Sequence, residues 1–395
     1  EAYDYNILHE TFNYGIGAQY MINKGNYITA DCYADHFSSS YCFFKDNKIY
    51  NGKAGEEQVR KRTRNHNLSI KGIFKLGNRH KLSVGTEYIV DVLKSQTDNI
   101  AKEDAYTLAL FAQDEIKLLR NLQALIGVRY IYHENFKNHA TPNVALMYKP
   151  GKFNFRASYA AGFRTPTLSE LYATDIAKKN DRLTIGNLDL KSEKNNYFSL
   201  SAEYVHERFS VSVNAFYNNI RDMIDYNTIA TGDKAMEQYG HKEVRQRDNI
   251  AEAKVHGINV SANAYLGAGF NLSGGYTHLN TQDVELEQPI DKSIKNAYNI
   301  NAQWAHSWKI YRLNINLNGR INSKRFSKSY GYAPEYQLWD LNTRHSFNLK
   351  SVIIEPGCGM ENLFDYMDDR PYNSNYATLT PGRSFYISLS LKFKS

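Results

Sequence analysis

Tyrosine and histidine side chains in the polar stretches of this chain could bind a metal-containing or aromatic ligand. His241 and Tyr239 lie close together in a long polar segment, where an imidazole and a phenol could bind an iron centre. Tyr332 lies in another such segment, near Tyr336, and its ring could stack on a planar ligand. An ordinary polar loop explains the same residues without a ligand, so both interpretations stay open.

Side chains for catalysis or for a resident metal show no such arrangement. The 12 His residues are scattered, and no Ser-His or Asp-His grouping of a hydrolase stands out. The three Cys residues lack zinc-site spacing. Cys32 and Cys42 would lie roughly 33 Å apart in an extended strand, so a disulfide needs a turn near residues 36–40; three free thiols are the alternative. We expect no enzyme, no metal site and no covalently bound cofactor.

Charge and hydropathy narrow the class of protein further. The net charge of +7 over 395 residues is spread along the chain, and no basic face with stacking aromatics predicts a nucleic-acid partner. Mean hydropathy is −0.58, and no apolar run approaches the roughly 20 residues of a spanning helix. Two basic clusters are interpreted as solvated surface of predicted outer loops, with contact to surface anions as the alternative: Arg60, Lys61, Arg62 and Arg64, and Lys242, Arg245 and Arg247.

The elements that position these residues are β-strands with one apolar and one polar face. Residues 312–322 and 384–393 alternate strictly between apolar and polar side chains, and successive side chains of a strand face opposite sides. In a membrane barrel the apolar set faces lipid and the polar set faces the lumen. The predicted lipid-facing side chains are Leu313, Ile315, Leu317, Phe385, Ile387 and Leu389, and the predicted lumenal ones are Asn314, Asn316, Ser388 and Ser390.

About seventeen such strands are predicted, and the connections between them alternate between short and long. The predicted strands are 11–22, 27–44, 63–76, 81–95, 105–118, 123–133, 140–149, 154–163, 196–206, 209–226, 250–266, 270–282, 295–307, 312–326, 336–347, 352–364 and 383–393. The predicted long connections include 45–62, 96–104, 133–140, 164–195, 227–249, 327–335 and 365–382. Outer-membrane barrels have short periplasmic turns and long extracellular loops, and the 31 Tyr and 19 Phe would supply their aromatic girdles. The pattern predicts an all-β, transmembrane antiparallel β-barrel.

Five segments resemble the barrel of TonB-dependent outer-membrane receptors of the haem, siderophore and cobalamin type. They are LFAQDEIKL at 110–118, FRTPTLSELY at 163–172, GNLDLKSEK at 186–194, ENLFD at 361–365 and TPGRSF at 380–385, in the family's order. FRTP and GNLDL are similar to the FRAP and NPNL boxes of haem receptors, although residues 167–185 lack the His usual there. The motif residues are Phe163, Arg164, Thr165, Pro166, Asn187, Leu188, Asp189 and Leu190.

The resemblance implies the energised import of a scarce metal chelate across a bacterial outer membrane. Haem or another iron complex, such as an iron-siderophore, is favoured over cobalamin; a non-specific porin and an outer-membrane enzyme are alternatives. The implied partners are the TonB complex, outer-membrane lipid and, as a further candidate, a surface lipoprotein. The candidate substrate-binding residues lie in predicted outer loops: Arg164, Tyr172, Tyr239, His241 and Tyr332.

Receptors of this family carry an N-terminal plug inside a 22-stranded barrel, so residues 1–395 would form only its C-terminal portion. We expect the plug and about the first five strands on a separate or missing N-terminal segment. By the parity of the connections, Glu1 would lie in an extracellular loop, where proteolytic nicking concentrates. A gap or a truncated chain is the alternative to a nick at Glu1.

Overall fold

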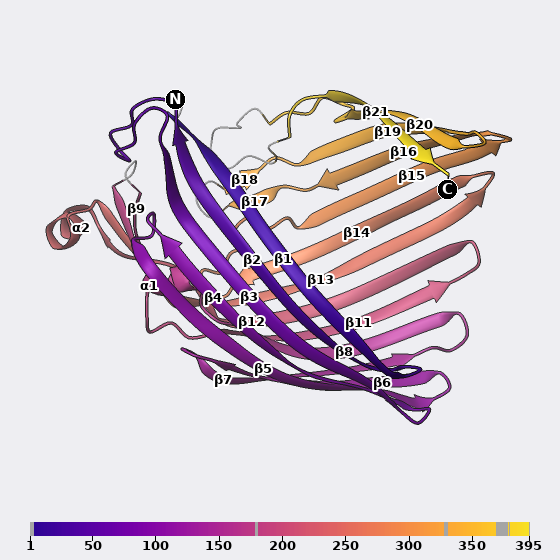
Figure 1. Cartoon of the computed structure of the whole chain (residues 1–395), viewed down its shortest axis with the longest axis horizontal. Helices are drawn as coiled ribbons and strands as arrows, with labels where there is room; N and C mark the ends of the chain where they lie inside the picture. The colour runs from indigo at the N-terminus through magenta and orange to yellow at the C-terminus, as the bar shows by residue number, and fades with distance from the viewer. Residues whose placement is uncertain (1–3, 178–180, 328–330, 369–377, 379, 395) are drawn as a thin grey trace. The chain divides into compact units, whose positions relative to one another are not determined.

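A computed structural model of the chain describes residues 4–177, 181–327, 331–368, 378 and 380–394 (Figure 1). This part of the chain has 21 strands and two short helices. Four of the strands, β9, β10, β17 and β18, have only three or four residues, which leaves seventeen long strands. Glu1, the expected site of a nick, lies outside the described residues.

The chain divides into two compact units. Unit 1 comprises residues 1–146, 159–196 and 220–252, and unit 2 comprises residues 147–158, 197–219 and 253–395. The strands β8 (Phe153–Arg164), β11 (Glu193–Val205), β12 (Phe209–Thr231) and β13 (Glu243–Gly267), and the last two residues of the strand that ends at Tyr148, divide between the two units in this way.

Six long strands of unit 1 pair antiparallel in chain order, as the indigo and purple ribbons of Figure 1 show. They are β1 (Tyr5–Asn23), β2 (Asn26–Phe43), β3 (Glu57–Leu76), β4 (His80–Ser95), β5 (Ile100–Leu119) and β6 (Leu122–His133). Their register aligns polar side chains in rows: Asp35 lies opposite Asn65, and Asn65 opposite Asp91. On the other face, Leu68 lies opposite Tyr88 and Tyr88 lies opposite Leu108, so that these three side chains form an apolar row.

β7 (Lys137–Tyr148) is a further long strand, most of which belongs to unit 1. The remaining elements of unit 1 are short: α1 (Leu168–Tyr172), β9 (Thr174–Ala177), β10 (Arg182–Ile185) and α2 (Gly232–Tyr239). β10 pairs antiparallel with β9 and parallel with the beginning of β13. These short elements give the connections 165–192 and 232–242 a defined structure, and neither helix was predicted from the sequence.

Within unit 2, antiparallel pairing runs from the second part of β13 onward. Its further strands are β14 (Phe270–Asp283), β15 (Asn296–Trp308), β16 (Tyr311–Asn322), β17 (Arg325–Ser327), β18 (Gly331–Ala333), β19 (Tyr336–Asn348), β20 (Val352–Glu361) and β21 (Ser384–Phe393). A Gly-Ala-Gly turn joins β13 to β14, and a Cβ on Gly269 would lie 2.0 Å from the Ala305 carbonyl oxygen. Only glycine fits this close backbone approach.

The predicted alternation appears on these strands. Phe385 and Ile387 of β21 are 70% and 87% exposed, as expected for side chains that face lipid. On the polar face, the Asn301 amide donates hydrogen bonds to Asn316 and Asn318 across the strand pair. Within the described ranges, no helix is long and apolar enough to cross a membrane.

Several predicted connections are corrected by longer strands. The predicted loop 96–104 shrinks to residues 96–99, and the predicted loop 133–140 shrinks to 134–136. The loop 45–62 ends at residue 56, so the basic cluster from Arg60 to Arg64 lies within β3 and not in a loop. Polar residues at these strand ends had hidden the backbone pairing that continues beyond the apolar band. Cys32, Cys42 and Cys358 are free thiols, and β2 runs without a turn between the first two.

Candidate functional site

The FRTP motif forms the exit from β8 into a capped helical turn. β8 ends at Arg164, and Pro166, which has no N–H to donate to a strand ladder, comes directly after it. Thr167 then caps α1: its hydroxyl accepts a hydrogen bond from the Glu170 N–H (3.2 Å), and the Glu170 carboxylate accepts one from the Thr167 N–H (2.8 Å). This reciprocal capping box sets the direction in which the chain leaves the sheet.

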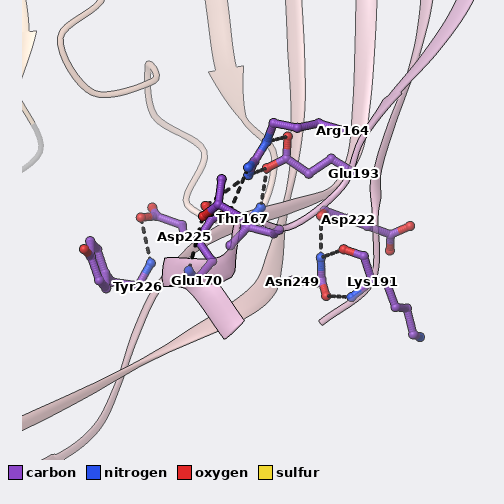
Figure 2. A network of polar contacts seen from close by, with 10 residues as sticks. Arg164, Thr167, Glu170, Lys191, Glu193, Asp222, Asp225, Tyr226 and Asn249 are labelled. Carbon is purple, nitrogen blue, oxygen red and sulfur yellow. Dashed lines mark hydrogen bonds and ion pairs between the residues drawn. The ribbon is translucent and has the colours of Figure 1, made fainter. Parts of the chain in front are cut away.

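Arg164 is held between two carboxylates that come from different parts of the chain (Figure 2). Its guanidinium donates to both Glu193 oxygens, at 2.9 and 2.6 Å, and to both Glu170 oxygens, at 2.8 and 3.2 Å. The carboxylates are mostly buried, at 13% and 15% exposed, whereas the Arg164 side chain is 42% exposed. We call these three residues the arginine clamp; it ties the end of β8 to α1 and to the start of β11.

The clamp changes the protonation equilibria of its members. Burial of Glu170 opposes its ionisation, but the hydrogen bonds from Arg164 and Thr167 outweigh burial and lower the pKa of this carboxyl. The hydrogen bonds to Glu193 and Glu170 raise the pKa of Arg164. Arg164 and Glu170 are therefore both charged at neutral pH.

A second set of hydrogen bonds holds the C-terminal end of the same connection (Figure 2). The Asn249 side chain accepts a hydrogen bond from the Lys191 N–H (2.7 Å) and donates to the carbonyls of Lys191 (2.9 Å) and Asp222 (2.6 Å). The Ile224 N–H donates to Glu193, which links β12 to the arginine clamp. One amide and one carboxylate thus join three chain segments.

The GNLDL motif packs this connection onto α1. A Cβ on Gly186 would lie 2.4 Å from the Leu171 carbonyl oxygen, so only glycine fits there. Asn187 accepts a hydrogen bond from the Asp189 N–H in a tight turn. Leu190 is buried with Leu171 and Ile224 in a small apolar core, whereas Leu188 is exposed.

A cavity of about 430 Å³ lies between this connection and the polar face of β2–β5. Asp35, Lys61, Asp91 and His133 line it from the strands, and Thr165–Leu168, Ser169 and Leu171 line it from the connection. One Asp35 oxygen is buried and has no hydrogen-bond partner among the described residues. The cavity therefore carries both signs of charge and an unmet acceptor.

Asp98, in the turn between β4 and β5, joins that turn to the FRTP connection. Its carboxylate accepts a hydrogen bond from the Ser169 hydroxyl (2.9 Å) and lies 3.8 Å from the Lys61 ammonium. Its carbonyl accepts a hydrogen bond from the Thr174 N–H (2.7 Å). These contacts hold α1 and β9 over the ends of β3 and β4.

An aromatic and cationic cluster lies at the same ends of β1–β3. Tyr5 stacks on Tyr41 with ring centroids 4.4 Å apart, and Tyr50 meets Tyr41 edge-on at 5.1 Å. The Arg60 guanidinium lies 5.2 Å from the Tyr41 ring and 5.4 Å from the Tyr50 ring, within cation–π range. Arg60 also lines a cavity of about 390 Å³ together with Lys61, Arg62 and Lys94. The arrangement offers aromatic rings and a concentrated positive charge to a ligand.

The five predicted substrate-binding residues lie in three places. Arg164 belongs to the arginine clamp, and Tyr172 packs beside it against the apolar core. Burial, with smaller contributions from Glu103 and Glu134, raises the pKa of the Tyr172 phenol, which therefore stays protonated. Tyr239 ends α2, and the nearby His241 imidazole lies 2.9 Å from the Asp181 carboxylate, whose pKa its hydrogen bond lowers.

Tyr332 lies in unit 2, on β18, where it meets Phe326 edge-on at 5.4 Å. Within the described ranges, no group of three or more His, Cys, Asp or Glu side chains could hold a metal ion. Ligand contact by Arg164, Tyr172, Tyr239, His241 or Tyr332 stays a prediction.

The sequence reasoning missed Glu170, Glu193, Asn249 and the Arg60–tyrosine cluster. The Thr167-x-x-Glu170 spacing is a capping-box pattern and could have located α1. Glu193 and Asn249 had no such local signal, because their partners lie far away in the sequence.

A comparison with protein families identifies the architecture. The family model for the TonB dependent receptor-like β-barrel matches residues 2–363. The chain belongs to this family. Its fold is accordingly the transmembrane antiparallel barrel of TonB-dependent receptors, as the sequence predicted.

Individual related proteins and solved structures support the assignment to the TonB-dependent receptor barrel. The ferric enterobactin receptor of Pseudomonas aeruginosa is 23% identical over 80% of this chain and 49% of its own length. A crystal structure of a mutant of the Pseudomonas aeruginosa ferric enterobactin receptor covers 98% of this chain, with a TM-score of 0.79 and 18% identity. The siderophore receptor PirA of Acinetobacter baumannii also covers 98%, with a TM-score of 0.76 and 16% identity. The chain spans 49% of the first relative and 62% of each of these two structures.

Proposed function

We propose that the protein containing this chain imports an anionic iron chelate of the siderophore class across the outer membrane, driven by TonB. It acts as a transporter and not as an enzyme. The family membership supports the class of protein, and two of the structural relatives are receptors for siderophores by name. Haem, cobalamin, a porin function and an enzymatic function are the alternatives that experiment must separate.

The observation that carries the chelate proposal is the cluster of Arg60 with Tyr41 and Tyr50. Ferric catecholate chelates combine flat aromatic rings with net negative charge. Rings of that kind stack on tyrosine, and a guanidinium over the rings attracts their negative charge. Lys61, which lines the neighbouring cavity, adds positive charge that would draw such an anion.

Further parts of the transporter are proposed from the family alone. They are a plug domain and about five additional strands N-terminal to the barrel portion described here, on a separate or continuous segment, and the TonB complex that acts on the plug. A surface lipoprotein is a further candidate partner. Denaturing electrophoresis of the purified receptor, followed by mass spectrometry, would test whether the segment is separate. One intact band of full receptor length would show a continuous chain.

Growth of a deletion strain on single iron sources tests the proposed ligand. The strain, depleted of its own chelators, is supplied with ferric catecholate, ferric hydroxamate or haem, and a cobalamin-requiring derivative is supplied with cobalamin. We expect loss of growth on one ferric siderophore and restoration by the plasmid-borne gene. Growth equal to wild type on every source would contradict the proposal, and loss on haem or cobalamin alone would replace it with that alternative.

A matched pair of variants tests whether the Arg60 cluster contacts the chelate. Arg60→Gln should weaken binding of the ferric catecholate by about 5- to 30-fold, from the roughly 1–2 kcal/mol expected of a partly desolvated cation–π contact. Arg79→Gln removes the same charge in the turn between β3 and β4, at the opposite strand ends, and should leave binding unchanged. Equal affinity of both variants, measured by fluorescence quenching of the purified receptor, would remove the Arg60 cluster from the binding site.

A further inference from the structure

The face of β3 that carries its apolar residues changes character along the strand. Ile70 and Leu68 are exposed there, as befits contact with lipid, and His66 follows on the same face. The next two side chains on this face, Arg64 and Arg62, are exposed cations. The apolar band therefore ends in positive charge at the strand end that leads to residues 44–56, a long connection.

The strand register extends this positive charge across three strands. Arg62 lies directly opposite Lys94 of β4, and Arg64 lies directly opposite His36 of β2. Like charges directly opposite each other in a sheet are unfavourable. Arg62, Arg64 and Lys94, which we call the outward basic patch, therefore keep an electrostatic cost that an anion would remove.

The protein itself supplies no such anion. Among the described residues, Arg62, Arg64 and Lys94 form no ion pair, whereas the neighbouring Lys102 lies 3.1 Å from Asp104. Glu10 of β1 lies in the same cross-strand row as Arg62, and it accepts a hydrogen bond from Ser38. Asp104 of β5 lies in the same row as Arg64, and it pairs with Lys102. Neither carboxylate pairs with any of the three cations of the outward basic patch.

A groove of about 370 Å³ runs beside Arg62 and Arg64 on this face. Phe12, which is 66% exposed, and His36 line it with Glu10 and Ser38. The Nε2 atom of His36 is buried and has no hydrogen-bond partner among the described residues. Further along β1, Ile16 continues the apolar surface on the same side. A ligand for this groove needs an anionic head and an apolar body.

The family places this groove at a membrane interface. In outer-membrane barrels the long connections are extracellular, so the outward basic patch lies at the outer edge of the apolar band. Arginine is well suited to bind phosphate, because its planar fork donates two parallel hydrogen bonds. We propose that the outward basic patch binds the phosphate of a phosphorylated lipid in the outer leaflet, whose acyl chains lie along Phe12, Ile16 and Leu68. This inference needs the family's membrane location but not the identity of the imported chelate.

Lipid retention by the full-length receptor tests this proposal. The receptor is purified in detergent, incubated with phosphorylated lipid A or with its dephosphorylated form, and analysed by native mass spectrometry. Wild type should retain the phosphorylated form preferentially. Arg62→Gln/Arg64→Gln should weaken retention by about fivefold per removed charge, from roughly 1 kcal/mol for each cation near an anionic surface. Arg62→Lys/Arg64→Lys should keep most of it.

Lys102→Gln is the matched control, because Lys102 is already paired with Asp104 on the same sheet. Heat-dependent mobility on gels confirms that each variant forms a folded barrel. Equal retention by wild type and Arg62→Gln/Arg64→Gln, or equal retention of both lipid forms, would overturn the proposal. Displacement of the lipid by inorganic phosphate at similar concentration would also overturn it, because the site would then serve a soluble anion.

Discussion

Removal of the Arg164 guanidinium should open the connection between β8 and β11 without unfolding the barrel. In Arg164→Gln, the Glu170 and Glu193 carboxylates, 13% and 15% exposed, would face each other without their cation. Breaking a buried pair costs about 3–5 kcal/mol, and exposed pairs contribute about 0.2–1 kcal/mol. Since Arg164 is 42% exposed, solvent screens part of the effect, and we expect about 2–3 kcal/mol.

Hydrogen exchange followed by mass spectrometry measures this opening in the full-length receptor. Amides of residues 165–177 and 181–192 should exchange about 30- to 150-fold faster in Arg164→Gln, the equivalent of 2–3 kcal/mol, while β2–β5 stay protected. Arg156→Gln is the control, because Arg156 lies on the same strand and has no carboxylate partner among the described residues. Adding Glu170→Gln to Arg164→Gln should restore part of the protection. Unchanged exchange in Arg164→Gln, or the same change in Arg156→Gln, would refute the clamp.

Three further predictions concern protonation, backbone contact and the lipid face. The clamp lowers the pKa of Glu170, so the stabilisation from this carboxylate is present above the ordinary carboxyl range and is lost as pH falls through the lowered pKa. Pepsin should therefore cleave residues 165–192 more slowly in wild type than in Glu170→Gln. This difference in cleavage rate should vanish at the lowest pH. Gly186→Ala should destabilise the packing on α1 by about 1–3 kcal/mol, because its Cβ meets the Leu171 carbonyl, and faster exchange there would show it. Ile387→Arg should cost about 2–4 kcal/mol in denaturant unfolding if position 387 lies near the bilayer midplane, whereas a neutral effect would contradict a lipid-facing side chain.

The long strands could be predicted because their signal is local. The alternation in segments such as 312–322 repeats every two residues, so each strand can be read without its neighbours. The ends of the strands could not be predicted, because the strand pairing continues there through polar residues. Arg62 and Arg64 look like loop residues in the sequence, yet β2 and β4 pair with β3 on both sides of them.

The candidate site was only partly accessible from the sequence. The FRTP and GNLDL motifs lie at the two ends of the connection 165–192, and Thr165 and Pro166 line the cavity described above. Four of the five N–H donors of Arg164 pair with Glu170 and Glu193, and substrate contact by Arg164 stays a prediction. Those pairings depend on three-dimensional register and have no periodic signature. The Arg60 cluster likewise forms from residues on three segments that meet only after the strands pair.

Uptake of radioactive iron bound to a ferric catecholate by intact cells tests the proposed transport most directly. The assay compares cells with the wild-type receptor, cells with Arg60→Gln and cells lacking the gene, each with and without a proton uncoupler. We predict uncoupler-sensitive uptake with wild type, strongly reduced uptake with Arg60→Gln at limiting chelate, and none without the gene. Uptake that is independent of the gene, or that continues unchanged with the uncoupler, would contradict energised import by this receptor.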